Sequence, residues 1–199
     1  MTDSSNDHKR VRLSFISNNF IRGIIKKSHF RITRRYYRLR YLKCGKYVDF
    51  GYRFRFSIKK PYKAVIGDNI FIEEFNVWNA QLGDIIVGSN CLFGLHNIIM
   101  GPVTIGDRLN TGPNVSILGP RHAVYGYDLI DDKRTIIGNN VWISTGSIIF
   151  PGITIGDNVI IGPGSVVTKD VPKDAFFLGN PARDMSKAFK FDSEQSQQN

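Results

Sequence analysis

Residues 137–167 read IGNNVWISTGSIIFPGITIGDNVIIGPGSVV, and an aliphatic residue returns at every sixth position from Ile137 to Val167. The same period of six runs earlier in the chain, from Val87 to Ile117. Glycine commonly follows the first residue of a repeat, and asparagine or aspartate stands beside it. Repeats of this length and composition are the signature of a parallel β-helix, in which three hexapeptides form one triangular coil.

The physics of such a coil explains the composition of the repeat. Each aliphatic side chain points into a narrow prism and stacks on its copy one coil away, while glycine, asparagine and aspartate tolerate the tight corners. No coil buries its apolar face alone, so stability grows by stacking. A β-sandwich would show two-residue alternation and irregular strand spacing instead. We therefore predict an all-β solenoid of about five coils over residues 61–190.

The period of six lapses twice within this solenoid. Ile66 and Val87 are 21 residues apart rather than the 18 of a regular coil, so we expect a short insertion near residues 75–84. Residues 118–135 carry no repeat at all before the period resumes. A solenoid that loses and regains its period has extruded a loop, and loops of this kind carry function more often than the scaffold does.

Composition places a basic arm on an acidic body. The 199 residues are 42% hydrophobic and 22% charged, as in ordinary globular proteins, and their number fits one domain with an arm or tail. Residues 1–60 contain 17 Lys and Arg against 3 Asp and Glu, whereas residues 61–199 contain 10 against 14. Apolar residues at spacings of three and four predict an amphipathic helical arm within residues 1–60, and residues 191–199 are predicted to be a disordered tail.

The charge asymmetry indicates an anionic partner for the arm. Residues 47–58 alternate aromatic residues with arginine, which favours a strand, and residues 9–46 mix cations with apolar side chains, which favours peripheral contact with an anionic membrane. The arm has no recognised nucleic-acid motif and the body is acidic, so we expect no nucleic-acid partner. No apolar run is long enough to span a bilayer, and the first ten residues lack a signal-peptide core. We expect a cytoplasmic protein with reduced Cys44 and Cys91, peripheral at the inner face of the membrane.

Four runs make the sequence resemble the hexapeptide-repeat acetyltransferases, which include galactoside and maltose O-acetyltransferases and the acetyltransferases of bacterial capsule and exopolysaccharide clusters. These runs are residues 140–143 (NVWI), 151–159 (PGITIGDNV), 162–172 (GPGSVVTKDVP) and 179–183 (GNPAR). The resemblance implies a left-handed β-helix, a homotrimer, active sites between adjacent subunits, and acetyl-CoA as the co-substrate.

The resemblance also implies a general base in the extruded loop. His122 stands nine residues after Pro113, a spacing similar to that of the catalytic histidine of the galactoside enzymes. A positioned imidazole that takes the proton of an attacking hydroxyl contributes roughly 10²–10⁴-fold to the rate. His8 lies in the polar N-terminal tail and His29 in the basic arm, where catalysis is not expected. Since no histidine has a second ligand at metal spacing, we expect no metal.

Further residues match positions that bind the two substrates in the family. The resemblance places the pantetheine arm and the phosphates of the coenzyme beside Trp142, Ser144, Thr145, Gly162, Pro163, Thr168, Lys169 and Arg183. The acceptor side departs from the galactoside pattern, and its expected residues are His96, Asn97, Tyr125 and Asp128. For His96, the alternative to acceptor binding is a surface or structural role. For Trp142, the alternative to coenzyme binding is packing against a neighbouring subunit.

Together these features predict an acetyl-CoA-dependent O-acetyltransferase that acts on a sugar hydroxyl, with a surface-polysaccharide intermediate or a lipid-linked oligosaccharide as acceptor. Two alternatives stay open within enzymes, N-acetylation of an amino sugar and acetylation of an antibiotic. A β-helical binding or scaffold protein is the alternative outside enzymes. Its γ-carbonic-anhydrase-like form needs a zinc site with several histidines, whereas this chain has four histidines without metal-ligand spacing.

Overall fold

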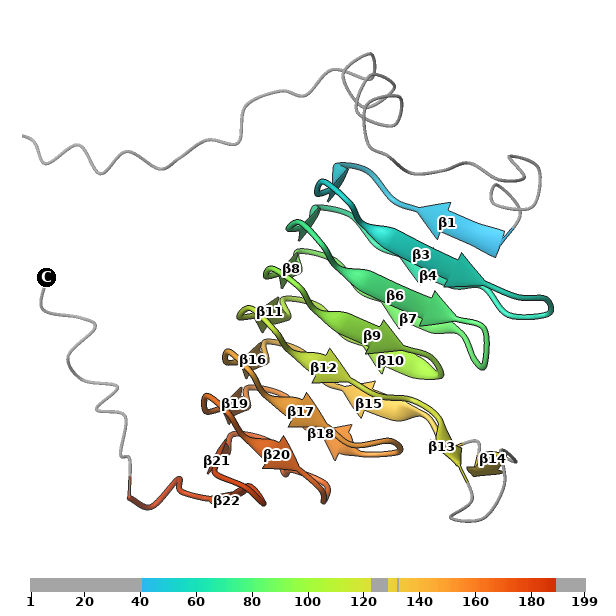
Figure 1. The fold of residues 1–199 in the computed structure, drawn as a ribbon. Coiled ribbons are helices and arrows are strands. Elements are labelled where there is room, and N and C mark those ends of the chain that lie inside the picture. Colours follow the sequence, from blue (N-terminus) through green and yellow to red (C-terminus); the bar gives the residue numbers. More distant parts are fainter. Residues whose placement is uncertain (1–40, 123–128, 132, 189–199) are drawn as a thin grey trace, which may run out of the picture.

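A computed structural model of the chain describes residues 41–122, 129–131 and 133–188. The helical arm predicted before residue 41 and the tail after residue 190 lie outside the described residues. Three sheets, parallel except for one antiparallel pair at the C-terminal end of the second, form the sides of a triangular solenoid, whose coils stack along one axis (Figure 1). Among the described residues, no helix is long and apolar enough to cross a membrane.

Each coil contributes one strand to each sheet, so neighbouring strands in a sheet are far apart in the sequence. Sheet 1 contains β1 (Leu42–Cys44), β4 (Ala64–Ile66), β7 (Ile85–Val87), β10 (Val103–Ile105), β15 (Thr135–Ile137) and β18 (Thr154–Ile155). Sheet 2 contains β2 (Val48–Phe50), β5 (Ile70–Ile72), β8 (Leu92–Phe93), β11 (Asn110–Thr111), β16 (Trp142–Ile143), β19 (Ile160–Ile161), β21 (Phe176–Leu178) and β22 (Arg183–Asp184). Sheet 3 contains β3 (Arg55–Ile58), β6 (Val77–Ala80), β9 (Ile98–Met100), β12 (Ser116–Ile117), β17 (Ile148–Ile149) and β20 (Val166–Val167).

The period of six in the sequence is the stacking period of the core. Ile137 pairs in parallel register with Ile105 on one side and Ile155 on the other, and all three side chains are buried. The same holds in the other two sheets, where Ile143 pairs with Ile161 and Ile149 pairs with Val167. The predicted parallel β-solenoid is confirmed, while its left-handed winding stays an implication of the resemblance.

The sequence predicts that the solenoid starts at residue 61, but the structure shows a further coil before this residue. Sheets 1 and 3 each hold six strands, so five coils follow residue 61 as predicted and one more precedes them. In that first coil, β1, β2 and β3 pair in parallel with β4, β5 and β6. The single strand expected over residues 47–58 is two strands, β2 and β3, which are separated by a corner at Arg53.

Asparagine forms much of the corner between sheets 1 and 2, because this corner needs a left-handed backbone. Asn69, Asn90, Asn140 and Asn158 all have φ between 55° and 61°, a region that asparagine tolerates better than most residues. Their amides also bond from coil to coil. Asn140 Nδ2 donates to Asn158 Oδ1 at 3.0 Å, and Asn158 Nδ2 donates to Asp174 Oδ1 at 2.8 Å.

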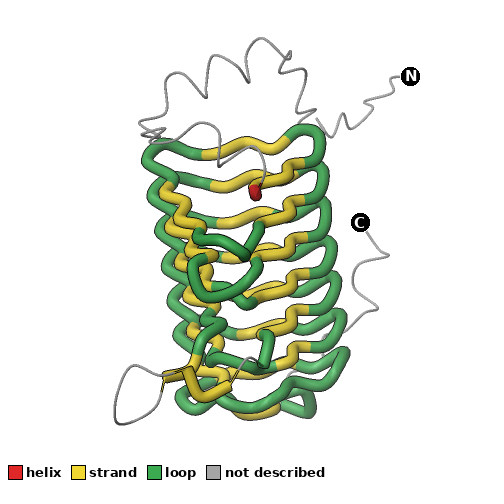
Figure 2. Tube along the Cα trace, turned by 90° about the vertical axis from the view of Figure 1, so that its right-hand side faces the viewer, coloured by secondary structure: helices red, strands yellow, loops and turns green. Residues whose placement is uncertain are grey.

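Both breaks in the period lie at the corner between sheets 3 and 1. The short insertion is the turn over residues 81–84 between β6 and β7. The long one leaves the solenoid after β12 and returns at β15, as the sequence predicts. It carries a small antiparallel hairpin, β13 (Arg121–His122) and β14 (Leu129–Asp131), that projects from the side of the solenoid (Figure 2).

Candidate active site

Six of the eight predicted coenzyme residues lie on sheet 2 or on the corner that follows it, which we call the 2–3 corner (residues 94–97, 112–115, 144–147 and 162–165). Trp142 lies on β16 between Asn110 of β11 and Ile160 of β19, with which it pairs in register. Its indole points away from the core and is 54% exposed. An exposed tryptophan on a flat sheet is therefore available to a ligand or to a neighbouring subunit.

Four of the coenzyme residues stack directly on one another at this corner. Ser144 and Thr145 turn the chain in one coil, and Gly162 and Pro163 occupy the same places in the next. The backbone N–H of Ser144 donates to the carbonyl of Ile161, and the N–H of Gly164 donates to the carbonyl of Thr145, both at 2.9 Å. The structure thus brings these predicted residues together as a column of small side chains.

Gly162 is buried and packs against the side chain of Leu178. A Cβ atom at this position would lie 2.5 Å from Cδ1 of Leu178, and glycine itself is buried here. Its carbonyl accepts hydrogen bonds from the hydroxyls of Ser147 and Ser165 at 3.0 and 2.6 Å. The glycine therefore serves the corner itself, and the exposed Pro163 is what this coil presents to solvent.

The predicted phosphate-end residues fall into two places. Arg183 is exposed on β22, the last strand of sheet 2, and its Nη1 donates to the carbonyl of Ala182 at 3.0 Å. Thr168 and Lys169 lie instead at the corner between sheets 3 and 1, the 3–1 corner (residues 59–63, 81–84, 101–102, 118–122, 129–131, 133–134, 150–153 and 168–170). Within one chain the structure therefore does not gather these three residues.

His122 also belongs to the 3–1 corner. It is the second residue of β13, and it pairs with Leu129 of β14 across the hairpin. The structure describes the backbone of this residue and not its side chain, while Tyr125 and Asp128 lie outside the described residues. The predicted base and the column of small coenzyme residues are thus at different corners of the same solenoid.

Two predicted acceptor residues occupy the 2–3 corner of the third coil. His96 has a left-handed φ of 57° and stacks its exposed ring on Phe75 of the preceding coil, with ring centroids 4.8 Å apart. Asn97 is fully buried, and its amide bridges two coils: Nδ2 donates to Thr111 Oγ1 at 2.5 Å, and Oδ1 accepts from the N–H of Val115 at 2.7 Å. These contacts favour structural roles for both residues.

A shallow hollow of about 270 Å³ near the 2–3 corner was not predicted from the sequence. Three acidic residues and two apolar residues line it together with Gly51: Asp49, Glu73, Glu74, Phe71 and Leu95. Burial raises the pKa of the Asp49 carboxyl above its ordinary value, and a backbone hydrogen bond from Phe50 partly offsets this. The lining residues come from three successive coils, and none of them is an inward-facing aliphatic residue of the repeat, so the period of six does not mark them in the sequence.

No group of three or more potential metal ligands occurs within residues 41–122, 129–131 and 133–188. The two cysteines in this part of the chain are both free. Burial raises the pKa of the Cys91 thiol to about 11, which makes it a poor nucleophile and a poor metal ligand at neutral pH.

Comparison with known proteins identifies the solenoid. Residues 134–169 match the bacterial transferase hexapeptide (six repeats) family, and residues 84–117 match the hexapeptide repeat of succinyl-transferase. A Dictyostelium discoideum protein that is named as an acetyltransferase is 35% identical over 136 residues, which are 65% of this chain and 70% of that protein. The chain belongs to the hexapeptide-repeat acetyltransferase family. Galactoside O-acetyltransferase of Escherichia coli (strain K12) is 37% identical over 136 residues, 65% of this chain and 66% of that enzyme.

The similarity to other family members is partial in length. The chain spans 66%, 47% and 62% of the first three curated relatives that it matches. Among solved structures, a mutant form of an N-acyltransferase from Bacillus cereus, in complex with dTDP and coenzyme A, superimposes with a TM-score of 0.64 at 19% identity. That similarity covers 79% of this chain and 89% of the other, and it shows a shared fold.

Proposed function

We propose that this protein transfers the acetyl group of acetyl-CoA to a hydroxyl of a sugar, with His122 as the general base. The observation that carries the proposal is the position of His122. It lies on the first strand of the hairpin of the long excursion, in a chain whose curated relatives include galactoside O-acetyltransferases. We further propose that the acceptor is a surface-polysaccharide intermediate, because the resembling family includes the acetyltransferases of bacterial capsule and exopolysaccharide clusters.

The chemistry of this reaction needs few groups. The imidazole of His122 takes the proton from the sugar hydroxyl as its oxygen attacks the carbonyl carbon of the thioester. Backbone N–H groups stabilise the oxyanion of the tetrahedral intermediate. The carbon–sulfur bond then breaks, and coenzyme A leaves as a thiolate that collects the proton from the imidazolium. The products are the sugar acetate and the free thiol of coenzyme A, so atoms and charges balance.

The residues on sheet 2 fit a long substrate with an apolar arm and an anionic end. Exposed Trp142 offers an apolar surface beside the small residues of the 2–3 corner, and exposed Arg183 stands at the end of the same sheet. A guanidinium is suited to phosphate oxygens because its N–H groups match them in pairs. We therefore assign Trp142 to the pantetheine arm and Arg183 to the phosphates.

The separation of the two corners supports active sites that are shared between subunits. His122 lies at the 3–1 corner, whereas Ser144 and Thr145 lie at the 2–3 corner of the same chain. When two solenoids pack side by side, the 3–1 corner of one can lie against the 2–3 corner of the next. Closed rings are built from such head-to-tail interfaces. We propose a homotrimer, the assembly that the family resemblance implies.

The first coil supports the proposed membrane contact of residues 9–46. Within residues 41–63 the chain carries seven Lys and Arg against one Asp. All seven cations are exposed, and they lie on two sides and all three corners of the coil: Lys43, Lys46, Arg53, Arg55, Lys59, Lys60 and Lys63. Tyr47 and Tyr52 are exposed among them, and tyrosine favours membrane interfaces. We propose that this end of the solenoid lies on the inner face of the cytoplasmic membrane.

Release of free thiol from acetyl-CoA tests the function. The purified protein is offered simple sugars, amino sugars and lipid-linked oligosaccharides, and thiol release with a simple sugar, which has no amine, indicates O-acetylation. With an accepted sugar, His122→Ala is expected to lower kcat by roughly 10²–10⁴-fold while leaving acetyl-CoA binding nearly unchanged.

His8→Ala is the matched control, because it removes a histidine from the polar N-terminal tail and is expected to keep kcat. A His122→Ala variant that retains more than about a third of the wild-type kcat contradicts the assignment of the base.

A further inference from the structure

The neck of the long excursion is where the chain leaves and re-enters the solenoid. On the outgoing side, the N–H of Leu118 donates to the carbonyl of Ile149 at 3.1 Å, which continues the ladder of sheet 3. On the returning side, the N–H of Thr135 donates to the carbonyl of Pro102 at 3.1 Å. The two ends of the excursion are therefore anchored to different coils, one after it and one before it.

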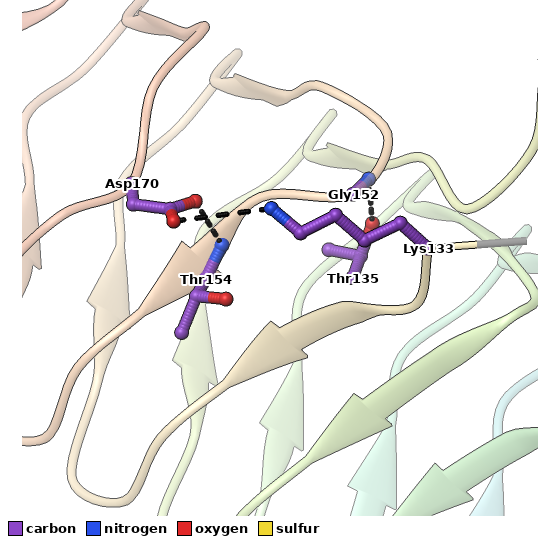
Figure 3. Close-up of polar contacts among 5 residues, drawn as sticks. All are labelled: Lys133, Thr135, Gly152, Thr154 and Asp170. Atoms are coloured by element: carbon purple, nitrogen blue, oxygen red, sulfur yellow. Dashed lines mark hydrogen bonds and ion pairs between the residues drawn. The ribbon is translucent and has the colours of Figure 1, made fainter. Parts of the chain in front are cut away.

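A single buried hydroxyl joins the two ends. Thr135 Oγ1 donates to the carbonyl of Leu118 at 2.6 Å and accepts from the N–H of Gly152 at 2.9 Å. Figure 3 shows the second of these bonds, from the turn of the next coil to the threonine. Thr135 is 0% exposed. The hydroxyl thus links the start of the excursion, its end, and the coil that follows.

A hydroxyl is unusual at this place in the core. The residues that occupy the same register in the three preceding coils of sheet 1 are Ala64, Ile85 and Val103. Valine would fill the same volume as threonine without the cost of burying a polar group, which is about 1–3 kcal/mol when the group has no partner. Packing alone therefore does not explain Thr135, whereas its two hydrogen bonds at the neck do.

The other polar contacts at the neck are weaker. Lys133 Nζ lies 3.9 Å from Asp170 Oδ2, but the two side chains are 54% and 59% exposed, and exposed pairs of this kind contribute about 0–1 kcal/mol (Figure 3). Arg134 Nη1 donates to the carbonyl of Val103 and to Thr104 Oγ1, both at 3.2 Å. These side-chain contacts lie near the surface of the solenoid, whereas the Thr135 hydroxyl makes its two hydrogen bonds in the buried part of the neck.

Backbone packing also holds the outgoing side. Gly119 is buried, and a Cβ atom there would collide with the carbonyl of Met100 and with the backbone of Pro102. The excursion therefore starts against the same turn that accepts the N–H of Thr135. The threonine hydroxyl adds a side-chain link between this start and the following coil, so we expect the first residues of the excursion to be held less firmly when its two bonds are lost.

We propose that Thr135 is a positioning residue for His122, an inference that rests on the proposed function. His122 lies four residues after Leu118, so little chain separates the fixed carbonyl from the base. The threonine touches no reacting atom, and it acts by holding the neck. Errors of about 1 Å in the position of a catalytic group cost on the order of 10²-fold in rate, so this hold matters for kcat.

The test compares Thr135→Val with Thr135→Ser. The valine variant keeps the volume but leaves the Leu118 carbonyl and the Gly152 N–H unpaired, and we expect kcat to fall by about tenfold or more with KM for acetyl-CoA within about twofold. The serine variant restores the hydroxyl and is expected to recover at least about half of the wild-type kcat. Ile85→Ala is the control, because it destabilises the same column two coils away without touching the neck.

Amide hydrogen exchange gives a readout that does not depend on activity. In Thr135→Val, peptides covering residues 118–122 and Gly152 are expected to exchange faster than in wild type, while Thr135→Ser and Ile85→Ala leave them unchanged. If amide exchange in the valine variant is unchanged, the Thr135 hydroxyl does not hold the neck. If the kcat of the valine variant is no lower than that of Ile85→Ala, Thr135 does not position His122. If the wild-type protein acetylates no acceptor while amide exchange responds as expected, the proposed function is wrong, whereas the structural role of the Thr135 hydroxyl at the neck is supported.

Discussion

Asp49 shows how the setting of one residue changes its chemistry. It lies on β2 and pairs in register with Phe71, whose ring is 42% exposed beside it. Two further carboxylates, Glu73 and Glu74, line the same hollow. Burial raises the pKa of Asp49 above its ordinary value of 3.8, since a carboxylate loses hydration there and gains only a backbone hydrogen bond in return.

This pKa shift predicts how stability depends on pH. A folded-state pKa above the unfolded value means that the ionised form is disfavoured in the folded protein, so the penalty is present above the folded pKa and absent below 3.8. Asp49→Asn is therefore expected to raise the Tm at pH 7, with a gain that shrinks as the pH falls through the folded pKa. Thermal unfolding of both proteins at pH 3.5, 5 and 7 measures this. A gain of equal size at all three pH values contradicts it.

Single residues were the hardest level to predict from the sequence. The sequence pointed to Asn97 as an acceptor residue, but its amide is buried between Thr111 and Val115. The repeat pattern identifies which aliphatic residues face the core, yet it does not distinguish an asparagine that supports a corner from one that faces solvent. Thr135 was missed for a related reason: threonine fits a repeat position sterically, and only the structure shows what its hydroxyl binds.

At the scale of elements, the regular coils were predictable because packing enforces their period. From β7 to β10 and from β15 to β18 the register advances by 18 residues, and an aliphatic side chain recurs at the buried places of these strands except at Thr135. Each inward position must fill the same narrow space as its neighbours one coil away. The hexapeptide repeat is therefore the direct record of this constraint, and five coils could be predicted from it.

The first coil could not be predicted because it is longer and is filled differently. Its register to the second coil advances by 22 residues, from Leu42 to Ala64, and the next advance is 21 residues. Aromatic rings fill much of the interior here: Phe54 packs against Phe50 of the same coil and edge-on against Trp78 of the second coil, with centroid distances of 4.8 and 5.6 Å. Phe50 and Phe54 are four residues apart, so the aromatic residues of the first coil do not follow the period of six.

At the scale of the whole molecule, the placement of the site across two corners has a direct test. His122→Ala chains and Trp142→Ala chains are each expected to be poorly active when they assemble alone. If the sites are shared between subunits, mixed assemblies refolded from equal amounts contain about a quarter of sites with both wild-type residues, and activity returns to that level. Thiol release after co-refolding measures it. Activity that does not rise above the average of the two parents shows that each chain carries its own complete site.

The distribution of charge along the solenoid axis gives the last prediction. Seven exposed cations surround the first coil, whereas residues 64–199 carry 9 Lys and Arg against 14 Asp and Glu. A ring of cations at the end of a rod can approach a plane together, so the end-on contact suits an anionic bilayer. Each cation near such a surface is worth about 1 kcal/mol, an attraction that weakens as salt shortens the Debye length.

We expect the full chain to sediment with phosphatidylserine vesicles at low salt and to be released at high salt. Replacing both Lys59 and Lys63 with glutamate is expected to weaken binding by about thirtyfold or more, the equivalent of at least two cation contacts. The matched control replaces Lys173 and Lys187 with glutamate. These two exposed lysines lie at the opposite end of the solenoid, and this variant is expected to bind the vesicles as wild type does. If the two double variants bind equally, the first coil does not face the membrane, and if wild type stays in the supernatant at low salt, the proposed contact is wrong altogether.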